Sequence, residues 1–125
     1  MISGTVNSFR EAVVRLIVRG PQGQEREVEA VVDTGFSGFL TLPKELIASL
    51  QLPLRGRGRA FLADGSETVF DFYEVTVLWD GHPRQLQVDM AETDPLLGMG
   101  LLYGSELMIE VVNDGRVAVR ALTVS

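Results

Sequence analysis

The sequence predicts a mostly β protein built from short antiparallel hairpins. Three observations support this prediction: segments rich in β-branched residues recur, Asp-Gly pairs separate several of them, and helical periodicity is confined to two short stretches. Strands at this spacing, with such turns between them, favour a small closed or half-closed β structure. We therefore expect a small β-barrel with one or two short helices.

The first predicted hairpin joins residues 11–19 to residues 25–32. The first segment is rich in β-branched residues and ends at a Gly20-Pro21-Gln22-Gly23 turn. The second segment alternates polar and apolar residues and then becomes apolar at Ala30-Val31-Val32. This hairpin leads directly into Asp33.

Three Asp-Gly pairs mark later turns, because this pair suits tight turns that need positive φ. They are Asp64-Gly65, Asp80-Gly81 and Asp114-Gly115. The expected strands around them cover residues 59–63, 67–79, 84–90, 108–112 and 116–122.

One helix is expected over residues 43–50, where Pro43 stands in the first turn and Leu46, Ile47 and Leu50 form one apolar stripe. A shorter helix is expected over residues 101–107. The alternating Arg55-Gly56-Arg57-Gly58-Arg59 is expected to be a flexible, solvated loop that leads into a hairpin. Asp89, Glu92 and Asp94 are expected in a solvated loop before Pro95.

The composition suits one domain, residues 1–125, that is globular and intracellular. A net charge of −6 argues against binding to nucleic acid or to an anionic membrane. The chain has no cysteine, and its only histidine is His82, so neither a disulfide nor an ordinary zinc site is expected. We expect no metal and no cofactor. The first ten residues lack the pattern of a signal peptide, which predicts a cytoplasmic protein.

The segment Asp33-Thr34-Gly35 places an ionisable carboxylate after a run of apolar residues. Buried aspartates need partners, and the next two residues offer a hydroxyl and a backbone without a side chain. The alternative interpretation is a strand end followed by a turn that the aspartate caps.

The wider context favours a site. Ser37-Gly38 follows the motif, a helix and a polar-tipped hairpin come next, and Leu96-Leu97-Gly98 precedes a second helix and a last strand pair. This order, over residues 11–112, resembles the retropepsin-like (retroviral-type) aspartic proteases of the single-lobe, bacterial kind. The resemblance implies a single-lobe acid-protease β-barrel with a flap hairpin.

The resemblance also implies a reaction and its residues. The chain would be an endopeptidase that cleaves peptide or protein substrates with a water activated by two carboxylates. Because the motif occurs once, the second Asp33 must come from an identical chain, so a homodimer is expected. Thr34 would bond across the dyad, the Gly35 amide would reach the carboxylate, and Ser37 would bond its outer oxygen.

The hairpin around residues 60–66 would be the flap that closes over the substrate. Its substrate-binding residues would be Phe61, Leu62, Ala63, Asp64 and Gly65. The alternative is an ordinary hairpin whose apolar residues face the core.

Two features depart from the family pattern. Phe36 stands where the family more often has alanine or serine, and the terminal strands that join the two subunits of viral members cannot be matched. Two other functions stay open, a non-catalytic dimerisation or peptide-binding module with the same fold and an unrelated ligand-binding barrel. The second of these would leave Leu96-Leu97-Gly98 unexplained.

Overall fold

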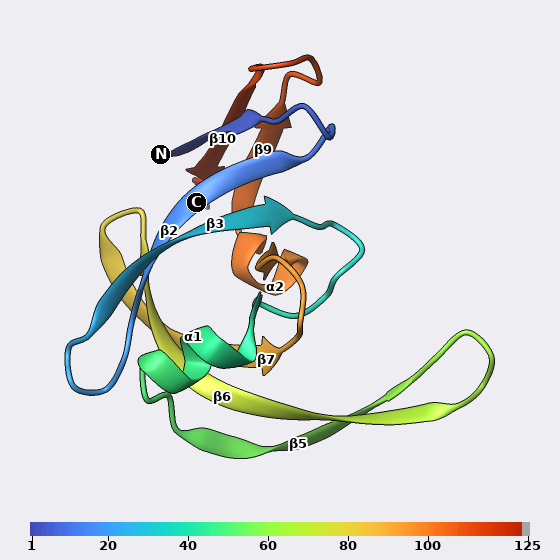
Figure 1. Cartoon of the computed structure of the whole chain (residues 1–125). Coiled ribbons are helices and arrows are strands. Elements are labelled where there is room, and N and C mark those ends of the chain that lie inside the picture. Colours follow the sequence, from blue (N-terminus) through green and yellow to red (C-terminus); the bar gives the residue numbers. More distant parts are fainter. Residues whose placement is uncertain (124–125) are drawn as a thin grey trace.

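The computed structural model describes residues 1–123, which form ten strands and two short helices around one apolar core (Figure 1). In chain order these elements are β1 (Ile2–Val6), β2 (Ala12–Arg19), β3 (Glu25–Val32), β4 (Leu40–Leu42), α1 (Lys44–Ser49), β5 (Leu54–Phe61), β6 (Glu67–Trp79), β7 (His82–Met90), β8 (Leu96–Leu97), α2 (Met99–Leu102), β9 (Ser105–Ile109) and β10 (Arg116–Ala121). No helix in this range is both long and apolar enough to cross a membrane.

All ten strands belong to one sheet, in the order β5-β6-β7-β4-β8-β3-β2-β1-β10-β9. An additional antiparallel pairing joins β6 to β2, and it closes the strands between them into a ring. Two short parallel pairings, β3 with β8 and β4 with β7, lie within this ring. The mostly β class predicted from the sequence is confirmed, and the ring is its barrel-like centre.

The core is built from the inward-facing residues of these strands. In β2, Val14, Leu16 and Val18 are buried while Arg15 and Ile17 are exposed, as expected of a strand with one solvated face. Leu40 and Leu42 of β4 are fully buried as well. The short helix α1 adds Ile47 to this core, and Leu50 at its end is also buried. The predicted first hairpin and the first helix are therefore confirmed.

Several sequence expectations were wrong. The second helix is a single turn that ends at Leu102, because Gly104 follows with φ of 86° and the chain enters β9 at Ser105. As a result, residues 110–112 lie in a turn and not in the last hairpin's first strand. Asp89 lies half-buried in β7, although Glu92 and Asp94 are exposed as expected.

The arginine–glycine segment is also not a loop. It forms most of β5, and the glycines are the reason: Gly56 pairs with Phe72 and Gly58 with Phe70 on β6. The two phenyl rings occupy the space where side chains would stand. The arginines project from the other face, where Arg57 pairs with Asp71 at 3.2 Å and Arg59 with Glu67 at 3.3 Å.

Candidate active site

Asp33 is the first residue after β3, at the end of a strand that is held on both sides. β3 pairs with β2 along its length, and its last two residues, Val31 and Val32, pair in parallel with Leu96 and Leu97 of β8. The Asp33 amide then donates a hydrogen bond of 2.9 Å to the Leu97 carbonyl. The sheet therefore fixes the backbone from which the carboxylate projects.

Asp33 is half-buried as a residue, and its carboxylate takes part in a tight local turn. The Oδ1 atom accepts a hydrogen bond of 2.9 Å from the Gly35 amide. The backbone carbonyl of Asp33 accepts one of 3.2 Å from the Phe36 amide. A Cβ on Gly35 would come within 3.3 Å of Oδ1, so glycine allows the close approach. The capped turn and the candidate site are thus the same structure.

The loop after Asp33 is fastened to the second motif by three backbone hydrogen bonds. Gly98 donates to the Phe39 carbonyl at 3.0 Å, Met99 to Phe36 at 2.8 Å and Gly100 to Gly38 at 2.9 Å. Residues 33–39 and 96–100, which are far apart in the sequence, therefore form one rigid unit. The structure brings the two motifs together in this way.

The motif and the residues just after it carry two hydroxyls. Thr34 and Ser37 are both exposed, and among residues 1–123 neither hydroxyl has a hydrogen-bond partner. In particular, Ser37 forms no bond with the Asp33 carboxylate within the described chain.

Sequence reasoning missed two positioning residues. The ring of Phe36 packs against Gly38 and Gly98, whose lack of side chains makes room for it. Thr41 is buried in β4, and its hydroxyl accepts a hydrogen bond of 2.9 Å from the Leu96 amide. The signal for Thr41 was a single polar residue between Leu40 and Leu42, since a buried hydroxyl needs a partner.

The flap candidate is an exposed hairpin tip between β5 and β6, and in Figure 1 this hairpin extends away from the ring of strands. Leu62 donates to the Ser66 carbonyl at 2.8 Å and Gly65 to Leu62 at 2.9 Å, and Gly65 has φ of 85°. Phe61 is 79% exposed and Leu62 52% exposed. The alternative of a hairpin with its apolar residues in the core therefore does not hold for these two side chains.

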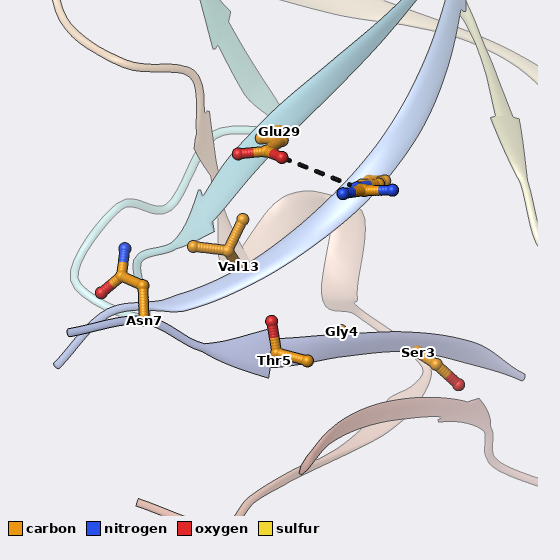
Figure 2. A pocket seen from close by; sticks show the side chains of 7 residues that line it. Ser3, Gly4, Thr5, Asn7, Val13 and Glu29 are labelled. Atoms are coloured by element: carbon orange, nitrogen blue, oxygen red, sulfur yellow. Dashed lines mark ion pairs between the residues drawn. The ribbon is translucent and has the colours of Figure 1, made fainter. Parts of the chain in front are cut away.

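Two hollows of the surface border the Asp33 loop, and a third lies apart from it. One of about 470 Å³, shown in Figure 2, lies over β1, β2 and β3 and includes the ion pair of Arg15 with Glu29 but no residue of the Asp33 loop. A second of about 480 Å³ is lined by Ser37 and by apolar side chains of Phe39 and Met99. A third of about 260 Å³ borders Thr34.

Among residues 1–123, no group of three or more histidine, aspartate or glutamate side chains could hold a metal ion. A second carboxylate lies near the loop, since Asp89 Oδ2 is 3.4 Å from where a Cβ of Gly38 would stand.

Comparison with known proteins gives matches in structure alone. No protein-family model and no curated protein sequence matches the chain. A solved retropepsin-like aspartic protease from Rickettsia conorii superposes with a TM-score of 0.62 at 19% identity, over 97% of this chain and 90% of the other. The EIAV protease bound to an inhibitor superposes with a TM-score of 0.57 at 15% identity, over 78% of this chain and 90% of the other. The chain therefore has the retropepsin-like fold that its motifs predict.

Proposed function

We propose that this chain is an aspartic-type endopeptidase, active as a homodimer in which Asp33 of each copy flanks one catalytic water. One observation carries the proposal: the carboxylate of the half-buried residue Asp33 stands in a loop whose backbone is anchored to Leu97 and to residues 98–100. Such anchoring fixes a reacting group before substrate arrives. The aspartic proteases among the structural neighbours support the same chemistry.

A pair of carboxylates that shares one proton can perform the whole reaction. The ionised Asp33 accepts a proton from water as the water oxygen attacks the scissile carbonyl carbon, and the protonated Asp33 of the second copy donates to the carbonyl oxygen. The tetrahedral intermediate then collapses: the C–N bond breaks, the leaving nitrogen takes the proton that the first Asp33 accepted from water, and a hydroxyl of the intermediate returns a proton to the second Asp33 as the product carbonyl forms. Two neighbouring carboxylates cannot both ionise at low cost, so the pair retains its shared proton.

The supporting residues keep the roles implied by the resemblance. Thr34 is exposed and free to bond across the dyad to the second copy, which would hold the two loops in register. The amide of Gly35 orients the carboxylate through its bond to Oδ1. Ser37, also exposed, would reach the outer oxygen of the carboxylate only after some adjustment of the loop.

The substrate would be an extended peptide segment held beneath the β5–β6 hairpin. Its backbone would pair with the flap by strand addition. Phe61 and Leu62 present exposed apolar surface at the tip, which supports a preference for apolar side chains near the scissile bond.

The decisive test is Asp33→Asn, assayed on a peptide library with products identified by mass spectrometry. Wild type should cleave, and the variant should lose cleavage by about 10³-fold or more while its fold is unchanged. The matched control is Glu27→Gln, the same carboxylate-to-amide change at an exposed position of β3, which should cleave like wild type. Cleavage retained by Asp33→Asn would overturn the proposal, and peptide binding without cleavage by wild type would favour the non-catalytic module.

A further inference from the structure

We propose that the second copy docks on a patch formed by Phe9, Val111 and Val112, beside Thr34, and not by exchange of terminal strands. This proposal rests on the proposed function, because one Asp33 makes only half of the catalytic pair. We name these three residues the loop patch. Phe9 lies in the turn between β1 and β2, and the two valines lie in the turn between β9 and β10.

The terminal strands are already paired within the chain. β1 lies between β2 and β10, and β10 lies between β1 and β9. The outer side of β9, the last strand in the sheet order, has no partner strand within residues 1–123. Exchanging β1 or β10 would require breaking ladders that already exist, so we place the contact between copies on another surface.

The loop patch exposes more apolar surface than a surface turn needs. Phe9 is 81% exposed, Val111 70% and Val112 65%. The end of β1 is bonded to the turn between β9 and β10, since Val6 donates to the Gly115 carbonyl and Asp114 to the Val6 carbonyl, both at 3.0 Å. Arg10, next to Phe9, and Val111 line the same hollow. Exposed apolar side chains that come from neighbouring turns mark candidate interaction sites.

The patch is continuous with the active-site loop. The hollow of about 260 Å³ is lined by Arg10 next to Phe9, by Val111, and by Val31, Val32 and Thr34 at the end of β3. In Figure 1 the turns after β1, β3 and β9 all lie on the same side of the molecule. A partner seated on the patch would therefore also face Thr34.

Both turns are stiffened locally, which lowers the entropic cost of docking. The side-chain oxygen of Asn7 accepts hydrogen bonds of 3.0 Å from the amides of Phe9 and Glu11. At the other turn, the carboxylate of Glu110 accepts bonds from the guanidinium of Arg116 at 2.7 and 3.2 Å. That contact lowers the pKa of Glu110, so the pair persists into mildly acidic solution.

The occupant that fits is a copy of the same chain. Around a twofold axis one patch meets itself, so its rim must carry both signs of charge. Arg10 and Glu11, neighbours at the rim, supply them, and Arg10 forms no ion pair within residues 1–123. A stable interface buries about 800 Å² per partner, more than three side chains provide. The proposed contact therefore extends beyond the loop patch, and its extension over Thr34 is the one that would bring the two Asp33 loops together.

The test is Val111→Asp/Val112→Asp in the full chain, studied by sedimentation over a range of concentrations. The substitutions should weaken the dimer by about tenfold or more, because each places a charge at a twofold contact. Both positions are exposed, so circular dichroism should show an unchanged fold. The matched control is Leu54→Asp, an exposed leucine at the start of β5, which should dimerise like wild type.

Activity separates this proposal from the proposed function. Cleavage per chain by Val111→Asp/Val112→Asp should return at high protein concentration, whereas Asp33→Asn should dimerise like wild type and stay inactive. The wild type could form a dimer that the patch substitutions disrupt and yet cleave no peptide. That result would support the interface and overturn the catalytic role. A wild type that is monomeric at all concentrations, or a dimer unchanged by the substitutions, would overturn the interface.

Discussion

Gly98 lies directly against the carbonyl oxygen of Gly38, in a space that no side chain could enter. A Cβ on Gly98 would overlap this oxygen and also the ring and carbonyl of Phe36. The same two segments are joined by hydrogen bonds from Gly98 to Phe39 and from Gly100 to Gly38. The glycine of the second motif therefore sets how closely the loop of Asp33 approaches α2.

Substituting Gly98→Ala should force these segments apart. Two of the obstacles are backbone atoms, which cannot move aside as the end of a side chain can. We expect a loss of about 1–3 kcal/mol in the free energy of unfolding, measured with urea. Cleavage should fall further than the unfolded fraction explains, because Asp33 would be displaced from its productive position.

The control for this substitution is Met99→Ala at the next position, where the side chain is exposed. It should change the free energy of unfolding by less than about 0.5 kcal/mol. If Gly98→Ala is as stable and as active as this control, close contact between the two motifs is not required.

The phenyl rings of Phe70 and Phe72 on β6 should stabilise the β5–β6 hairpin at Gly56 and Gly58. Phe70→Ala would uncover the backbone at Gly58, and cross-strand pairs of this kind contribute up to about 1 kcal/mol. Amide exchange along β5 should therefore become about fivefold faster by hydrogen-exchange NMR. Val69→Ala, on the exposed opposite face, is the control and should leave exchange nearly unchanged. Equal rates of amide exchange in both variants would mean that the Phe70 ring does not stabilise the β5–β6 hairpin.

The parts of the fold that the sequence predicted are those with local signals. The turn at Asp80-Gly81 was correctly predicted, and both residues have positive φ, 52° and 81°. The strand β3 and the helix α1 follow from alternation and from an apolar stripe. The prediction that Leu96-Leu97-Gly98 belongs with Asp33 rested on the order of motifs in a known family and not on periodicity.

The elements that the sequence did not predict depend on contacts across the sheet. Nothing within residues 55–59 indicates a strand, because the rings that fill the glycine positions come from β6. β4 and β8 are too short to show a period, and each exists only because a neighbour supplies hydrogen bonds. The loop patch was likewise invisible, since it unites turns that are about a hundred residues apart in the chain.

The turn at the flap tip should keep its bonds to Asp64 at lower pH than an ordinary aspartate would allow. The hydroxyl of Ser66 donates to Asp64 at 2.6 Å and its amide at 2.8 Å, and these bonds lower the pKa of Asp64 below 3.8. Because the folded pKa is depressed, this stabilisation is present above the unfolded value and is lost as pH falls through the folded one. Removing the hydroxyl with Ser66→Ala should raise the pKa of Asp64 toward its ordinary value, as read from a carboxyl NMR titration. Ser8→Ala should leave that titration unchanged, and identical midpoints in wild type and Ser66→Ala would contradict the role given to the hydroxyl.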